Sequence, residues 1–140
     1  MSTRSTQHYD VAVAGAGPVG AIAALAHARR GARVVLFEAN PKSALRLAGE
    51  WLHPPAIGAL SRLGIDLPAT IPEHAAGQGF VVFPDDGSAP CLLPYAEEAR
   101  SFSCEHSALV EALRAAATAD PNVEYLASAR VRRIEGQRLC

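Results

Sequence analysis

The chain has 140 residues, a size typical of one domain. Hydrophobic residues make up 49% and charged residues 19%, and these proportions exclude a disordered charged tail. The formal net charge of −1 provides no field for nucleic acid or for an anionic membrane. Three cysteines without CxxC spacing indicate free thiols in a reducing cytoplasm, not a disulfide framework or a zinc site.

The N-terminal region begins with residues 1–8, which we expect to be flexible. The stretch 11–28 then carries no charge, and its outline mimics a signal peptide or a membrane span. Alanine and glycine dominate this stretch and Gly17-Pro18 interrupts it, so the transfer energy is too small for stable insertion. A strand, a glycine turn and a helix are the better interpretation, and we expect no membrane span.

The first predicted elements form a strand–helix–strand unit. Residues 9–14 are typical of a buried parallel strand, and the sequence GAGPVG at 15–20 fits the pattern GxGxxG. A helix is predicted over 21–29 and a second strand over 33–37, closed by Glu38. The strand before the motif and the helix after it are the context that a dinucleotide-binding site requires.

Each conspicuous residue of this unit has a physical role. Gly15 permits the tight turn, and Gly17 lets backbone N–H groups approach a pyrophosphate. Gly20 lets the helix pack close to the strand, and the N-terminus of the helix attracts phosphate. Glu38, 18 residues after Gly20, would accept hydrogen bonds from ribose hydroxyls and would repel the 2′-phosphate of NADP. The motif indicates an adenine dinucleotide without distinguishing FAD from NAD, and a unit that binds nothing is the alternative.

The later elements depart from a nicotinamide domain, which usually continues with another short strand and helix. A polar connection over 40–49 is expected instead. Downstream we predict a helix over 55–63, a hairpin of strands 79–83 and 91–93, an amphipathic helix after Phe102 that ends before 120–122, and strands over 123–126 and 129–134.

The order of these parts resembles the N-terminal part of flavoprotein monooxygenases of the para-hydroxybenzoate hydroxylase type. Within that superfamily it is most similar to squalene epoxidases and their bacterial relatives. The resemblance rests on DVAVAGAGPVGAIAA (10–24), VVLFEAN (34–40), RLAGEWLHPPAIGALSRLGI (46–65), the GFVVF hairpin (79–83) and SFSCEHSALVEALRAAATADPNVEYL (101–126).

The resemblance implies FAD bound in an extended form. The residues that it assigns to the cofactor are Gly15, Ala16, Gly17, Pro18, Val19, Gly20, Glu38, Ala39, Arg46 and Val131. Arg46 matches a family arginine that reaches the phosphate and ribitol region of the flavin, although a solvated loop arginine is the alternative. Val131, in the strand predicted after Asn122, matches the place where family members hydrogen-bond adenine through the backbone. No catalytic residue and no metal ligand is assigned.

One position departs from the family pattern. Near the start of the long helix the family often places an arginine that braces the cofactor, and this chain has His106 there. Arg100 lies six residues earlier and is a weak substitute. Glu50 matches a carboxylate that lies near the flavin in the epoxidases, and solvation of a helix start explains it equally well. We therefore expect the flavin to be held less tightly or braced differently.

The fold expected from the resemblance is an α/β, Rossmann-like three-layer FAD-binding domain over 9–140, with a small added β-hairpin. The implied activity is that of a monooxygenase, either an aromatic hydroxylase or an alkene epoxidase, which uses a flavin C4a-hydroperoxide. NAD(P)H would be a transient reductant, and the substrate a small apolar or aromatic molecule.

Family members run to several hundred residues and carry later DG and GD motifs that have no counterpart in this chain, whose Asp86-Gly87 belongs to the turn of the predicted hairpin. The domain is therefore incomplete relative to the family, and we expect it to be inactive alone. It could act with further residues, with a second chain or by self-association. The alternatives are the front end of a halogenase or an isoprenoid reductase, and a non-catalytic module.

Overall fold

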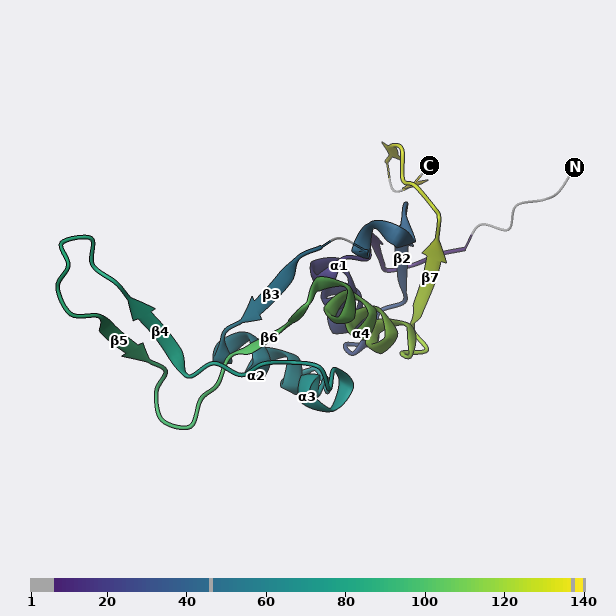
Figure 1. The fold of residues 1–140 in the computed structure, drawn as a ribbon. Helices are drawn as coiled ribbons and strands as arrows, with labels where there is room; N and C mark the ends of the chain where they lie inside the picture. The colour runs from purple at the N-terminus through teal and green to yellow at the C-terminus, as the bar shows by residue number, and fades with distance from the viewer. Residues whose placement is uncertain (1–6, 46, 137, 140) are drawn as a thin grey trace, which may run out of the picture. The chain divides into compact units, whose positions relative to one another are not determined.

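The computed structural model describes residues 7–45, 47–136 and 138–139. The chain divides into two compact units, shown as a ribbon in Figure 1. The first unit takes in Met1–Leu45 and Val110–Cys140, and the second unit is Arg46–Leu109. The flexible start predicted for residues 1–8 lies outside the described residues, except for residues 7 and 8.

A parallel three-stranded sheet forms the centre of the first unit. Its strands are β1 (Val11–Ala14), β2 (Val34–Glu38) and β7 (Val123–Ala127), in the order β1-β2-β7. The register sets Val34 opposite Val11 on one side and opposite Val123 on the other. The middle strand is the most buried, which explains its continuous run of β-branched and aliphatic residues.

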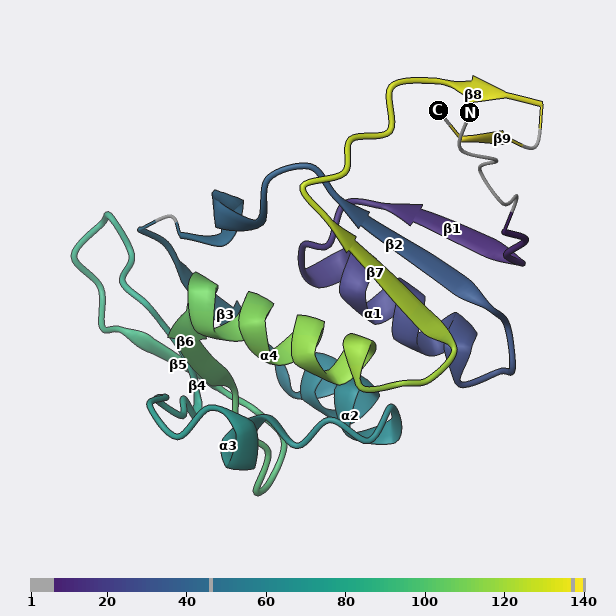
Figure 2. The ribbon, with the colours of Figure 1, turned by 90° about the vertical axis from the view of Figure 1, so that its right-hand side faces the viewer.

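Helix α1 (Pro18–Ala28) lies along this sheet and contacts all three strands (Figure 2). It buries a face of small and aliphatic residues, Ala21, Ala24, Leu25 and Ala28. The helix begins three residues before the predicted start, because proline has no N–H to satisfy and fits the first helical position. The uncharged stretch 11–28 is thus a strand, a turn and a helix. Among the described residues, no helix has the length and apolarity needed to cross a bilayer.

The C-terminal part of the chain confirms one predicted helix and corrects one predicted strand. Helix α4 (His106–Thr118) is the amphipathic helix, and Val110, Leu113 and Ala117 of its later part are buried. The strand predicted over 129–134 is wrong: Ser128 has a φ of +56° and ends β7. A short hairpin, β8 (Ile134–Glu135) and β9 (Arg138–Leu139), follows instead.

The second unit contains two strands that the sequence did not predict, and one short helix was not predicted either. The strands are β3 (Gly49–Leu52) and β6 (Phe102–Glu105), which pair antiparallel. Helix α2 (Pro54–Arg62), predicted one residue later, and the unpredicted short helix α3 (Leu67–Thr70) complete its helical part. Its buried apolar residues are Leu60, Ile65, Leu67, Ile71, Phe102, Cys104 and Leu109.

The predicted hairpin is confirmed as β4 (Gly79–Val82) and β5 (Cys91–Pro94). Its side chains are almost all exposed, whichever face of the ribbon they occupy. The large exposed residues are Phe80, Val81, Val82, Phe83, Leu92 and Leu93. The second unit therefore carries an apolar hairpin that is not part of its own core.

Candidate dinucleotide-binding site

The glycine turn connects the carboxyl end of β1 to α1. Gly15 has a φ of +103°, a conformation that favours glycine, and its N–H donates to Phe37 O at 2.8 Å. A Cβ built on Gly20 would lie 1.8 Å from Gly15 O, so the first turn of α1 rests directly on the loop. Gly15 and Gly20 thus have the structural roles predicted for them, namely the tight turn and the close packing of the helix.

The N-terminus of α1 faces open space. Gly17 is its N-cap, and a Cβ built there would meet no atom of the described residues within 4 Å, apart from its chain neighbours. No described side chain caps the helix, and its first turn carries no acidic residue. Val19 is 82% exposed. The first N–H groups of a helix have no intrahelical partner and carry partial positive charge, so this end is suited to an anion.

Glu38 ends β2 beside the glycine turn and is only 7% exposed. Its Oε2 accepts the Ala16 N–H at 2.9 Å, and its Oε1 accepts the Asn40 N–H at 2.8 Å. Ala39, between them in the chain, is exposed. The carboxylate therefore links the turn that follows β1 to the turn that follows β2, at the edge of the sheet where open α/β folds bind ligands.

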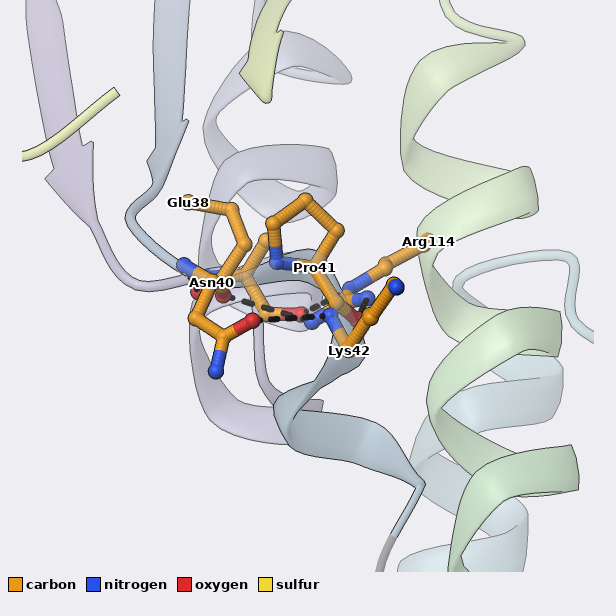
Figure 3. Close-up of polar contacts among 6 residues, drawn as sticks. Glu38, Asn40, Pro41, Lys42 and Arg114 are labelled. Carbon is orange, nitrogen blue, oxygen red and sulfur yellow. Dashed lines mark hydrogen bonds and ion pairs between the residues drawn. The ribbon is translucent and has the colours of Figure 1, made fainter. Parts of the chain in front are cut away.

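Arg114 completes this cluster from α4, as Figure 3 shows. Its Nη2 lies 3.2 Å from Glu38 Oε2, and its Nε donates to Ala16 O at 2.5 Å. Its Nη1 donates to Pro41 O at 3.0 Å, in the 3₁₀ helix η1 (Pro41–Ala44). Arg114 is not among the residues predicted from the sequence. The available signal was a basic residue on the buried stripe of α4, four positions after Val110.

The predicted bracing candidates, His106 and Arg100, belong to the second unit. His106 is buried, and its Nδ1 lies 2.5 Å from Glu50 Oε1. Arg100 is exposed and donates to Ala99 O.

Burial, and secondarily the charge of Glu50, raises the pKa of the Cys104 thiol in the second unit. The second unit also holds a cavity of about 460 Å³, which is lined by Leu47, Ala48, Gly49, Cys104 and Glu105.

Two of the predicted cofactor residues, Arg46 and Val131, are not found in their predicted settings. Arg46 lies outside the described residues. Val131 is in irregular chain after β7, not in the strand predicted for it. In the part of the chain that the structure describes, no group of three or more His, Cys, Asp or Glu side chains is arranged to hold a metal ion.

The glycine turn, the uncapped helix and the carboxylate after the second strand define a dinucleotide-binding unit of the Rossmann type. The sequence profile of the family described as "FAD dependent oxidoreductase" matches residues 10–139, and the chain belongs to that family. FAD is therefore the cofactor class of this fold, as the resemblance implied.

A relative found by sequence comparison agrees with this family assignment. A squalene epoxidase of Schizosaccharomyces pombe is 30% identical over 125 residues, which cover 85% of this chain and 27% of that protein.

Three solved structures share the fold. The p-nitrophenol 4-monooxygenase PnpA of Pseudomonas putida DLL-E4 has a TM-score of 0.74 and 23% identity, covering 91% of this chain and 33% of that one. The flavin-dependent brominase Bmp2 has a TM-score of 0.76 and 21% identity, covering 95% and 33%. A geranylgeranyl bacteriochlorophyll reductase-like protein of Thermoplasma acidophilum has a TM-score of 0.71 and 23% identity, covering 94% and 33%. The chain thus spans about a third or less of these proteins.

Proposed function

We propose that this chain is the FAD-binding part of a flavin-dependent monooxygenase, an aromatic hydroxylase or an alkene epoxidase. The observation that carries the proposal is the open, uncapped N-terminus of α1 beside the buried carboxylate of Glu38. In this proposal the motif at 15–20 holds the pyrophosphate, and Glu38 accepts a hydrogen bond from the adenosine ribose. The sequence match to a squalene epoxidase and the fold shared with a nitrophenol monooxygenase support the reaction class.

The residues present fit the adenosine half of FAD. A pyrophosphate is an anion, and the helix N-terminus offers it N–H donors across a glycine without a side chain. The Glu38 carboxylate already accepts from Ala16, Asn40 and Arg114, so about one of its four acceptor positions is left for a ribose hydroxyl. Its negative charge disfavours a 2′-phosphate, so NADP is not the ligand proposed for this site.

The remaining cofactor residues are assigned by the family pattern. Ala39 follows Glu38 beside the ribose, and Arg46 is proposed to reach the flavin phosphate and ribitol region. Val131 is proposed to contact adenine through its backbone. The position of Val131 outside the sheet supports this role, since its backbone groups are not used in the strand ladder.

FAD supplies the redox chemistry of such an enzyme, and the protein supplies binding, orientation and electrostatics. We propose that NAD(P)H is the transient reductant and that the substrate is a small apolar or aromatic molecule. We also propose a cytoplasmic location. Since the chain spans about a third or less of its relatives, the complete reaction is assigned to this chain together with further residues or a second chain.

A second candidate is the front end of a different flavin oxidoreductase. The fold shared with a brominase and with a reductase-like protein favours this alternative, because the same unit serves both. A tryptophan motif of the halogenase type in the residues that complete the enzyme, in place of DG and GD motifs, would select the halogenase. A folded chain that ignores FAD would instead indicate a non-catalytic module.

The visible absorption spectrum tests the proposal. The purified chain is mixed with FAD, passed through gel filtration to remove free cofactor, and scanned near ~450 nm. The proposal predicts a retained flavin band at one FAD per chain, and a weaker band for Glu38→Ala. A folded wild-type chain that retains no flavin would contradict it.

A further inference from the structure

We propose that Arg114 is the positioning residue of the adenosine site. Its guanidinium holds the Glu38 carboxylate in the orientation that binds the ribose. It also holds the glycine turn in the orientation that binds the pyrophosphate. This inference rests on the proposed function, because it assigns to Arg114 a role in FAD affinity that is exerted through Glu38 and Ala16.

The contacts of Arg114 join three separate segments. Each of its three nitrogens has its own acceptor: Nε has the Ala16 carbonyl, Nη1 the Pro41 carbonyl and Nη2 the Glu38 carboxylate. These acceptors belong to the glycine turn, η1 and the end of β2, which are the segments around the site in Figure 3. The Arg114 and Glu38 side chains are 13% and 10% exposed, so water competes little for these bonds.

Ala16 receives a hydrogen bond on each side of the turn. Its N–H donates to Glu38 Oε2, and its carbonyl accepts from Arg114 Nε. Because Arg114 Nη2 also contacts Glu38 Oε2, the three groups form a closed ring of hydrogen bonds. The ring fixes the two peptide planes that flank Ala16. The second of these planes carries the Gly17 N–H, one of the donors proposed for the pyrophosphate.

Only arginine suits this arrangement. A guanidinium is planar, always charged and presents five donors in a fixed fork, so it can bond three acceptors in different directions. A lysine ammonium at the same place keeps the charge but has a single nitrogen on a flexible stem. The Arg114→Lys variant therefore separates the charge of Arg114 from its geometry.

The test combines FAD affinity with a measurement that needs no FAD. FAD dissociation constants are measured by flavin fluorescence for the wild type, Arg114→Met, Arg114→Lys, Glu38→Ala and the double variant Arg114→Met/Glu38→Ala. Hydrogen exchange of the Ala16 amide is measured by NMR in the absence of cofactor. Arg29→Met is the matched control, since Arg29 is half exposed and lies 3.9 Å from its partner Asp120.

We expect Arg114→Met to weaken FAD binding by about tenfold to hundredfold, the equivalent of one hydrogen bond to a charged group. Arg114→Lys restores part of that loss, and Arg29→Met causes none. In the Glu38→Ala background the further loss from Arg114→Met is smaller than in the wild type, since the part exerted through Glu38 is already lost and only the bond to the Ala16 carbonyl remains. Exchange of the Ala16 amide is faster in Arg114→Met, and this readout does not depend on the cofactor.

Three results would overturn the inference. One is wild-type FAD affinity in a folded Arg114→Met variant. Another is full additivity with Glu38→Ala, which would mean that Arg114 acts independently of Glu38. The third is unchanged Ala16 exchange in Arg114→Met or, if that variant does not fold, unchanged exchange together with wild-type FAD affinity in Arg114→Lys. A folded wild type without FAD affinity would instead contradict the proposed function, and the cofactor part of this inference with it.

Discussion

A pair of glycine substitutions separates the packing role of the turn from its binding role. In Gly20→Ala the new Cβ would lie 1.8 Å from Gly15 O, far inside any permitted contact. That oxygen shares a peptide plane with the Ala16 N–H, which donates to Glu38 Oε2, so it cannot move alone. Overpacking of this kind costs about 1–3 kcal/mol, and alanine returns about 1 kcal/mol of helix propensity. A contact this short places the overpacking cost near the upper end of that range, at about 3 kcal/mol. After the gain in helix propensity, the free energy of unfolding should fall by about 2 kcal/mol.

Gly17→Ala is the matched change that leaves packing intact. Gly17 has a φ of −72°, which alanine adopts without strain, and the new methyl group meets only open space. Reduced freedom of the unfolded chain stabilises by about 0.4–1 kcal/mol, and the poorer N-cap costs a similar amount. The net stability should therefore change by less than about 1 kcal/mol. FAD affinity should fall at least about tenfold, because the methyl group occupies the approach of the pyrophosphate.

Urea unfolding followed by far-UV circular dichroism gives the stabilities, and flavin fluorescence gives the affinities. A Gly20→Ala variant as stable as the wild type would show that α1 does not rest on the turn. A Gly17→Ala variant with wild-type FAD affinity would show that the pyrophosphate lies elsewhere, even if FAD binds.

Three further predictions concern the core, the thiols and the hairpin. Leu25→Ala removes a fully buried side chain of α1 and should lower the free energy of unfolding by about 2–5 kcal/mol in the urea assay; a cost below 1 kcal/mol would contradict the packing of α1 on the sheet. Because burial raises the pKa of Cys104, its thiolate is scarcer than that of an unperturbed thiol at the same pH, and its side chain is also less accessible. Peptide mapping after maleimide treatment should therefore find the exposed Cys91 labelled well before Cys104, and equal rates in the folded protein would oppose this. Leu92→Gln replaces a side chain that is 72% exposed, so it should change the free energy of unfolding by less than about 0.5 kcal/mol. If the apolar hairpin mediates self-association, the same variant should lower the apparent mass in light scattering at high protein concentration. An unchanged mass would rule out that role of the hairpin.

The strand–turn–helix unit could be predicted because its signals are local. The glycine at the tight turn and the apolar run of β2 are signals carried by a few consecutive residues. The proline at the first helical position is an equally local signal, but it was not used and the helix was predicted to start three residues late. Glu38 could be placed for the same reason, since β2 ends with it. Its hydrogen bonds to Ala16 and Arg114 depend on the folded chain and were not predictable from spacing.

The missed features depend on partners that are distant in sequence. Strand β3 pairs with β6, fifty or more residues away, and its four residues alternate too briefly to stand out. The apolar residues of 129–134 mimicked a strand, but the positive φ of Ser128 had already turned the chain. Arg114 lies 76 residues from Glu38, so no spacing along the chain indicated that the two side chains meet.

The adenosine diphosphate half of FAD is proposed to bind at the glycine turn and Glu38. Amide NMR signals of the isotope-labelled chain, recorded during titration with FAD, locate this binding residue by residue. We expect saturable shifts that are largest at Gly17, Val19 and Gly20, with further shifts around Glu38. Shifts confined to the second unit, or none at saturating FAD in a folded chain, would contradict this proposal.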